Sequence, residues 1–399
     1  MRHVVGSGPR VPLSGLQDGY AARLREQGYT EKTILFRLKE YRRMGRWMVS
    51  ASLSPADLRE SLAEDYLRWC ASQGMVVVVT GRQVRNSIRI VRDLAGLEPE
   101  LPPAPDLVDE IVAGYRSWLV EVQGLSEATV HRYARSAGLF LRWAGVVKGG
   151  PEALTGQVLV AYLLGEVERQ SRDAAKGRVA ELRSLLRFMY QRGLIASPLG
   201  ESISPVASWR LASLPTGPSA GQVEAVIAGC PDSAGGRRDR VLLLLAARLG
   251  LRSVEIARLT LDDIDWRGQR ITVRGKAGRV DQMPLPGPLA LVLADYVLRD
   301  RGRPGGREVF WKVRAPIGPI NPALVGDATE RACRRLGFVP FGPHQLRHSL
   351  ARKVLAGRGD LVQVAQVLRH DDLATTAVYA KVDFGMLSEA VAGWPQVTP

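Results

Sequence analysis

The C-terminal part of the sequence contains six side chains of the types needed to break a phosphodiester bond. Such a reaction requires a nucleophile, cations around the negatively charged pentavalent transition state, and an acid for the departing oxygen. A tyrosine, two arginines, two histidines and a lysine can supply these functions: Tyr379, Arg252, Arg347, His344, His370 and Lys276. The sequence has no metal-ligand motif and no nucleotide-binding loop, so we expect chemistry without metal, ATP or another cofactor.

The expected role of each group follows from its chemistry. Tyr379 is the expected nucleophile, and because a phenol has an ordinary pKa of about 10, nearby cations or a base must assist it. Arg252 and Arg347 can hold non-bridging phosphate oxygens through paired hydrogen bonds. His370 precedes Tyr379 by nine residues and could donate to a phosphate oxygen. Lys276 could protonate the departing 5′ oxygen.

His344 and Arg347 have a spacing that predicts a shared helix face. They are three residues apart, directly after Pro343, and proline is favoured at the first position of a helix. Residues three apart lie on one face, here near the positive end of the helix dipole. We therefore expect both side chains to point toward one anion.

Four segments that contain these residues resemble the sequence boxes of the tyrosine recombinase (phage integrase) family. They are Leu249–Glu255, Val273–Lys276, His344–His348, and Leu368–His370 followed by Thr375 and Tyr379. The resemblance extends over about residues 213 to 385, in matching order and spacing. It implies a site-specific recombinase or integrase that cuts and rejoins DNA through a 3′-phosphotyrosine at Tyr379.

Taken one at a time, these residues have structural alternatives. Arg252 could be a surface charge, Glu255 could orient Arg252 or support its helix, and His344 could be a cap. Lys276 could be an ordinary turn residue and Tyr379 a packing residue. His348 matches a position outside the family's catalytic set, so we do not expect it to act in catalysis.

Arg369 departs from the resembled pattern, because the family commonly has glycine immediately before the last-box histidine. A bulky residue at this position could tilt His370, or its guanidinium could add a phosphate contact. Arg369 is therefore included among the expected DNA-binding residues.

The elements around these residues are expected to be mainly helical with a small hairpin. Alternating strands at Arg270–Val273 and Asp281–Leu285 flank Gly275–Gly278, a turn whose tip carries the lysine. Residues 222–227 and 240–249 are predicted helices. The apolar stripe Met386, Leu387, Ala390, Val391 and Trp394 predicts a final helix, which we expect to dock into a neighbouring protomer; packing on its own domain is the alternative.

The first two hundred residues contain an internal repeat. A constant shift of 96 positions aligns Gly28 with Gly124, Arg46-Trp47 with Arg142-Trp143, and Tyr66-Leu67 with Tyr162-Leu163. One offset that holds over such a length indicates a duplicated module of ordinary domain size.

Each copy is predicted to be helical. Thr30 and Ser126 are N-cap candidates, and both Trp47 and Trp143 end an apolar stripe and are predicted core residues. The arginines between the apolar positions could contact phosphates, or could form a solvated basic face. These expected DNA-binding residues are Arg37, Arg42, Arg43, Arg132, Arg135 and Arg142.

The predicted architecture is multidomain and mainly α, with two tandem helical modules and a tyrosine-recombinase catalytic domain. Proline-rich stretches at 101–105 and 197–220 mark the linkers. The expected bounds are 1–104 for the first module, 105–203 for the second, core-binding module, 204–219 for a linker, and 220–399 for the catalytic domain and tail.

Composition favours a DNA-binding protein of a reducing cytoplasm. The formal net charge of +15 favours anionic partners, above all double-stranded DNA. The three cysteines are far apart, no apolar run spans a bilayer, and no export signal is visible. The resemblance implies a homo-tetramer on two synapsed DNA sites. The apolar run Val76–Val79 in the first module makes a companion recombinase another candidate partner. A type IB topoisomerase and a catalytically silent DNA-binding protein are the alternatives.

Overall fold

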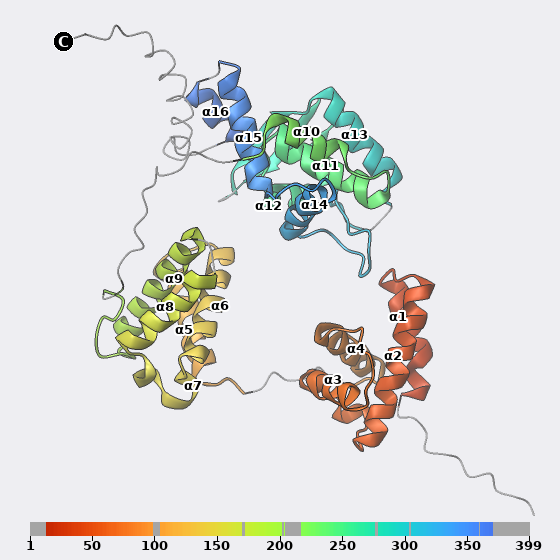
Figure 1. Ribbon diagram of the computed structural model, residues 1–399, viewed down its shortest axis with the longest axis vertical. Coiled ribbons are helices and arrows are strands. Elements are labelled where there is room, and N and C mark those ends of the chain that lie inside the picture. The colour runs from red at the N-terminus through yellow and green to blue at the C-terminus, as the bar shows by residue number, and fades with distance from the viewer. Residues whose placement is uncertain are drawn as a thin grey trace, which may run out of the picture. The chain divides into compact units, whose positions relative to one another are not determined.

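A computed structural model describes residues 13–98, 104–169, 172–201, 203, 217–275, 278–302, 305–358 and 360–369. The chain divides into two compact units, one of residues 100–212 and the other of residues 1–99 together with 213–399. Within the second unit, residues 13–94 and residues 223–368 have separate apolar cores. Figure 1 labels the helices.

Four helices form the first module. They are α1 Gln17–Glu26, α2 Glu31–Ser50, α3 Ala63–Ser72 and α4 Gly81–Leu94, with short 3₁₀ turns at Ser14–Leu16, Pro55–Asp57 and Glu60–Leu62. The predicted stripe of α2 is buried, including Ile34, Leu38, Tyr41 and Met48. A hydrophobic face of this kind stabilises a helix by packing more than by intrinsic propensity.

The second module has a similar order of helices, with one additional short helix, α7. It comprises α5 Leu107–Glu121, α6 Glu127–Trp143, α7 Val146–Gly149, a 3₁₀ turn at Pro151–Ala153, α8 Gly156–Arg169 and α9 Arg172–Gln191. Its core contains Val130, Ala137 and Phe140 from α6, which the sequence pattern predicted.

The local geometry of the two modules agrees at the predicted offset. The first residues of α2 and α6, Glu31 and Glu127, are 96 positions apart. The turns before them carry Gly28 and Gly124, both with positive φ (82° and 58°), a conformation that glycine adopts without the steric cost of a side chain. These matches support the predicted duplication, which stays a prediction.

Trp143 contradicts its predicted place in the core. Trp47 is 4% exposed, whereas Trp143 is 54% exposed; the Trp143 ring packs against that of Tyr162, with ring centroids 5.2 Å apart. The difference has a local cause, because α2 continues to Ser50 beyond Trp47 but α6 ends at Trp143. Helix α6 therefore does not extend past the second tryptophan.

The third group of elements contains the candidate site. Its helices are α10 Ala220–Ala228, α11 Ala234–Arg248, α12 Ser253–Arg258, α13 Gly287–Arg299, α14 Pro322–Arg335, α15 Pro343–Ala356 and α16 Leu361–Leu368, with a 3₁₀ turn at Leu261–Asp263. Helix α11 is the central one, because consecutive residues from Val241 to Leu243 are all fully buried. A helix that is apolar on every side is enclosed by its neighbours. The mainly helical fold predicted from the sequence is confirmed.

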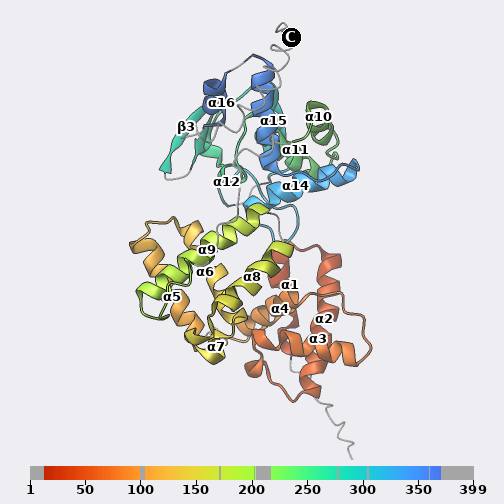
Figure 2. The same cartoon turned by 60° about the vertical axis from the view of Figure 1, so that its left-hand side comes forward.

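A three-stranded antiparallel sheet lies beside these helices, with β3 visible at its edge in Figure 2. The strands are β1 Ile264–Asp265, β2 Arg270–Arg274 and β3 Val280–Pro284. Val273 of β2 pairs with Asp281 of β3. The predicted hairpin is therefore confirmed to within one residue at each end, because period-two alternation and a glycine turn are local signals.

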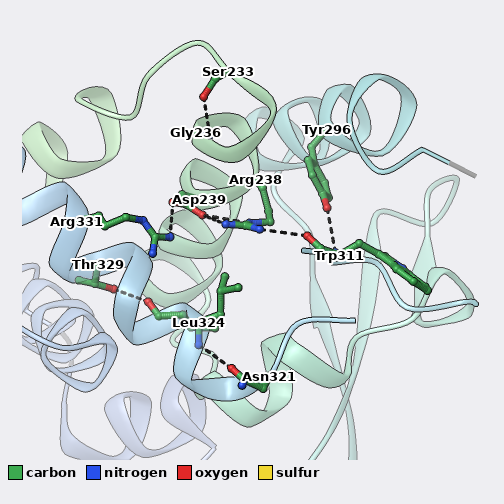
Figure 3. A network of polar contacts seen from close by, with 11 residues as sticks. Ser233, Gly236, Arg238, Asp239, Tyr296, Trp311, Asn321, Leu324, Thr329 and Arg331 are labelled. Atoms are coloured by element: carbon green, nitrogen blue, oxygen red, sulfur yellow. Dashed lines mark hydrogen bonds and ion pairs between the residues drawn. The ribbon is translucent and has the colours of Figure 1, made fainter. Parts of the chain in front are cut away.

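A buried polar network fixes α11 to α14 and to the chain at Trp311 (Figure 3). Arg238 is 4% exposed and donates to Asp239 Oδ1 over 2.7 Å and to the Trp311 carbonyl over 3.2 Å. Arg331 of α14 donates to the other oxygen of Asp239 over 2.7 Å. Asp239 pairs with both arginines, so no ion of the network is left unpaired, and the second positive charge is on Arg331, whose side chain is 44% exposed.

None of the described helices is long and apolar enough to cross a membrane. The described side chains also include no group of three or more His, Cys, Asp or Glu that could hold a metal ion.

Candidate active site

The start of α15 brings two of the expected catalytic residues into one helical turn. Gly342 is the N-cap and Pro343 occupies the first helical position, as predicted. His344 and Arg347 follow within this turn and share a face. The unpaired N–H groups at this end give it a partial positive charge, which favours an anion.

Arg347 is almost fully buried, with 2% exposure. Its guanidinium donates to the carbonyl of Gly250, between α11 and α12, and to the carbonyl of Leu368 at the end of α16. One side chain thus connects three segments that are far apart in the sequence. The carbonyls fix the plane of the guanidinium before any substrate arrives.

Arg252 is the N-cap residue of α12 and its side chain is 41% exposed. Its backbone N–H donates to Glu255 Oε2 over 2.8 Å, and its Nη1 donates to Glu255 Oε1 over 3.0 Å. Glu255 therefore both caps the helix and orients the arginine, so the two alternatives considered for this glutamate occur together.

The two arginines impose their charge on His344. Its pKa lies below the ordinary value because of partial burial and the positive charges of Arg347 and Arg252. Both guanidinium groups are therefore close enough to act on one imidazole. The ring of His348 lies 5.4 Å from that of His344, and its pKa is lowered by burial and by the charges of His344, Arg347 and Arg352. A phosphate at this site would meet a concentrated positive field.

Glu255 is ionised in the centre of this field. Burial alone would raise its pKa, but the hydrogen bond from the Arg252 N–H and the charge of Arg369 outweigh burial, so the pKa lies below its ordinary value. Arg369 donates from Nη2 to Glu255 Oε2 over 2.6 Å. One carboxylate is therefore shared by two arginines.

Three expected catalytic residues, Lys276, His370 and Tyr379, and the apolar stripe 386–394 lie outside the described residues. On either side of residues 276 and 277 the two strands of the hairpin are joined by a hydrogen bond from the N–H of Gly275 to the carbonyl of Arg279, over 2.8 Å. Leu368 and Arg369 end the described chain immediately before His370 and contact Arg347 and Glu255 respectively. The structure thus brings together Arg252, His344 and Arg347 with the chain leading to the last box.

The expected DNA-binding arginines differ in how far they are engaged within the protein. In the first module, Arg43 forms an ion pair with Glu40 and has a side chain only 13% exposed. Arg42 is exposed and donates to Gln17. Arg37 lies over the ring of Tyr29, 6.0 Å from its centroid. Arg42 and Arg37 are therefore better placed than Arg43 for a phosphate.

In the second module, Arg132 is 59% exposed and pairs with Glu181 over 3.1 Å. Arg142 is 43% exposed and pairs with Asp106 and Asp109. Arg135 is exposed. The side chain of Arg369, in contrast, is only 6% exposed. This low exposure gives no support to the predicted contact between Arg369 and a DNA phosphate. DNA binding by the other six stays a prediction.

Two residues that belong to the site were not expected from the sequence. Gly250 supplies a carbonyl to Arg347, and its φ of 61° is a conformation that favours glycine; a glycine directly after an apolar helix is a recognisable signal for such a helix end. Asp281 lies 3.6 Å from Arg369 Nη1. No sequence pattern marks Asp281, because the contact depends on strand register and on a distant segment.

Solved structures define the class of this fold. A lambda integrase dimer bound to a COC′ core site has a TM-score of 0.53 and 19% identity, covering 68% of this chain and 94% of that one. The XerH site-specific recombinase bound to a palindromic difH substrate has a TM-score of 0.53 and 17% identity, covering 75% and 99%. The fold is that of the tyrosine recombinases.

Sequence relatives establish the family. The sequence model of the phage integrase family matches residues 219–386. The putative integrase/recombinase y4rA of Sinorhizobium fredii is 36% identical over 75% of this chain and 74% of its own length. The tyrosine recombinase XerC of Xanthomonas campestris pv. campestris is 30% identical over 75% and 93%. The chain belongs to the phage integrase family of tyrosine recombinases, which confirms the expected enzyme class.

Proposed function

We propose that the protein recombines double-stranded DNA at specific sites through a 3′-phosphotyrosine intermediate at Tyr379. The convergence of Arg252, His344 and Arg347 at two helix starts carries the proposal, because the charges of both arginines act on His344 and the three groups together would hold a single phosphodiester. The net charge of +15 and the DNA-bound state of similar solved recombinases support DNA as the partner.

The two arginines and His344 would bind the non-bridging oxygens of the scissile phosphate. Their positions are set before DNA binds, by the Gly250 and Leu368 carbonyls for Arg347 and by Glu255 for Arg252. Preorganised donors stabilise a transition state because they need not reorient as charge develops.

The covalent step exchanges one phosphoester for another. The Tyr379 oxygen attacks phosphorus and its proton passes to solvent or a nearby base. The bond to the 5′ oxygen breaks, Lys276 gives that oxygen a proton, and His370 donates to a phosphate oxygen. A 5′ hydroxyl from another strand reverses these steps. One phosphoester bond forms for each one that breaks, so these steps need no ATP, and the cationic side chains would act without a metal.

The domain bounds and assembly belong to the same proposal. Residues 105–203 would clamp the core site together with the catalytic domain, residues 220–399. Residues 1–104 would bind further duplex, and a companion recombinase is the alternative partner of this module. Four protomers would act on two synapsed sites, with residues 384–399 docking into a neighbouring protomer. Such an enzyme would act at the nucleoid in the cytoplasm.

A plasmid assay separates this function from its alternatives. Supercoiled plasmids that carry two copies of a candidate site, taken from the DNA flanking the gene, are compared with plasmids that lack them. A recombinase exchanges strands only between sites, a type IB topoisomerase relaxes both plasmids, and a silent DNA-binding protein changes neither. Relaxation of the site-free plasmid, or inertness toward all flanking DNA, would contradict the proposal.

A further inference from the structure

Arg369 occupies a backbone position that disfavours any side chain. It is the C-cap of α16, with φ 53° and ψ 52° in the left-handed region. A residue with a Cβ atom pays about 1–2 kcal/mol there, whereas glycine adopts the conformation freely. The glycine typical of the resembled family is thus explained by the backbone, and an arginine needs a compensating interaction of its side chain.

That interaction is directed inward. The Arg369 side chain is 6% exposed and that of Glu255 is 4% exposed, and Arg369 Nη2 lies 2.6 Å from Glu255 Oε2. Asp281 of β3 lies 3.6 Å from Arg369 Nη1. A guanidinium is tolerated in such a place only when it is paired, because desolvation of an isolated charge is costly.

The same carboxylate also holds Arg252. Glu255 Oε1 accepts from Arg252 Nη1 over 3.0 Å, while Oε2 accepts from the Arg252 N–H over 2.8 Å. We propose that Arg369 is a positioning residue for strand cleavage, which acts through Glu255 to fix the guanidinium of Arg252 and to keep its charge available for the scissile phosphate. The proposal rests on the function proposed above.

The balance of charge around Glu255 explains why Arg252 needs Arg369. Glu255 and Arg252 alone would form a neutral pair whose attraction competes with phosphate binding. Asp281, the other partner of Arg369, is itself paired with Arg279 over 2.9 Å. The three arginines and two carboxylates of this cluster therefore sum to one positive charge, and Glu255 is shared between Arg252 and Arg369. Arg252, which is 41% exposed, can then direct its remaining N–H groups to an anion. Arg347 holds the Leu368 carbonyl, so the chain at Arg369 is fixed from two sides.

Two substitutions separate positioning from backbone strain. Arg369→Gly removes the guanidinium and also relieves the strained φ, so folding is favoured locally while the charge is lost. Arg369→Lys keeps the charge but replaces the planar fork by a point charge. Arg334→Ala is the control, because Arg334 is a 72% exposed arginine paired with Glu330 on α14 and its loss changes net charge equally.

Single-turnover cleavage of a nicked duplex at saturating protein provides the first measurement. We expect Arg369→Gly to cleave about tenfold more slowly, with an unchanged Kd for the duplex. This rate loss is smaller than the ~10²–10³-fold loss that follows removal of a complete transition-state donor. Added guanidinium should restore part of the rate in Arg369→Gly alone, and Arg369→Lys should be intermediate. An unchanged rate, or a slow rate that guanidinium leaves unaltered, would overturn the positioning role.

The second measurement needs neither DNA nor activity. Because the charge of Arg369 helps to depress the pKa of Glu255, Arg369→Gly should raise that pKa, observed by carbon NMR of labelled glutamate and assigned with Glu255→Gln. The Arg334→Ala control should leave it unchanged. An unaltered Glu255 pKa refutes the inference even if the wild type proves inactive. Cleavage by the wild type with no effect of Arg369→Gly refutes the inference alone and leaves the proposed function standing.

Discussion

Arg347→Ala should destabilise the catalytic domain as well as abolish its chemistry. The side chain is 2% exposed and donates to the Gly250 and Leu368 carbonyls, and both of these residues are buried. Alanine leaves two buried acceptors unpaired, at about 1–3 kcal/mol each. We therefore expect a loss of ~2–6 kcal/mol in the free energy of unfolding. For a domain of this size each kcal/mol lowers Tm by about 2–4 °C, which gives about 4–24 °C.

Calorimetry of the intact chain measures this shift, because it separates the transitions of independently folding parts. The matched control is Arg334→Ala, whose exposed helix-surface ion pair contributes only ~0.3–0.5 kcal/mol. Arg347→Lys should lie between the two, since one ammonium cannot reach both carbonyls with the geometry of a guanidinium. A Tm of Arg347→Ala within a degree or two of the control would show that the residue is not part of the structural framework.

Three further predictions concern other groups. The lowered pKa of His344 means that protonation of its imidazole opposes folding. The stabilisation that depends on neutral His344 is therefore complete above pH 6.5 and is lost as the pH falls through the lowered pKa. An NMR titration that places the pKa of His344 at or above 6.5 would contradict this. Lys276→Ala should cleave slowly on ordinary DNA but near the wild-type rate on a 5′-phosphorothiolate substrate, whose sulfur leaves without an acid, and failure of that rescue assigns Lys276 a structural role. Removal of residues 1–104 should shorten the DNase footprint and reduce the salt dependence of binding, by a slope of about 0.9 for each lost phosphate contact. An unchanged footprint with lost synapsis would favour a protein partner instead.

Features that depend on local sequence were predictable. Pro343 at a helix start placed His344 and Arg347 on one face, and alternation around a glycine turn placed the β2–β3 hairpin. Trp143 was placed wrongly because the apolar stripe does not reveal where α6 stops.

Long-range contacts at the site were not predictable. Arg347 and Gly250 are 97 residues apart, and Arg369 and Glu255 are 114 apart. The sequence showed that Arg369 replaces a glycine, but only the fold shows that its side chain turns inward to a carboxylate. Sequence spacing identifies candidate chemical groups, whereas tertiary packing decides which of them hold the others in place.

Covalent trapping tests the central claim most directly. A library of nicked duplexes built from the DNA flanking the gene allows cleavage but not religation, so a recombinase accumulates as a protein–DNA adduct. We expect the wild type to form the adduct, mass spectrometry to locate it on Tyr379, and Tyr379→Phe to bind the same duplex without forming it, because only the nucleophilic oxygen is lost. An adduct that persists in Tyr379→Phe, or that maps to another residue, would contradict the account.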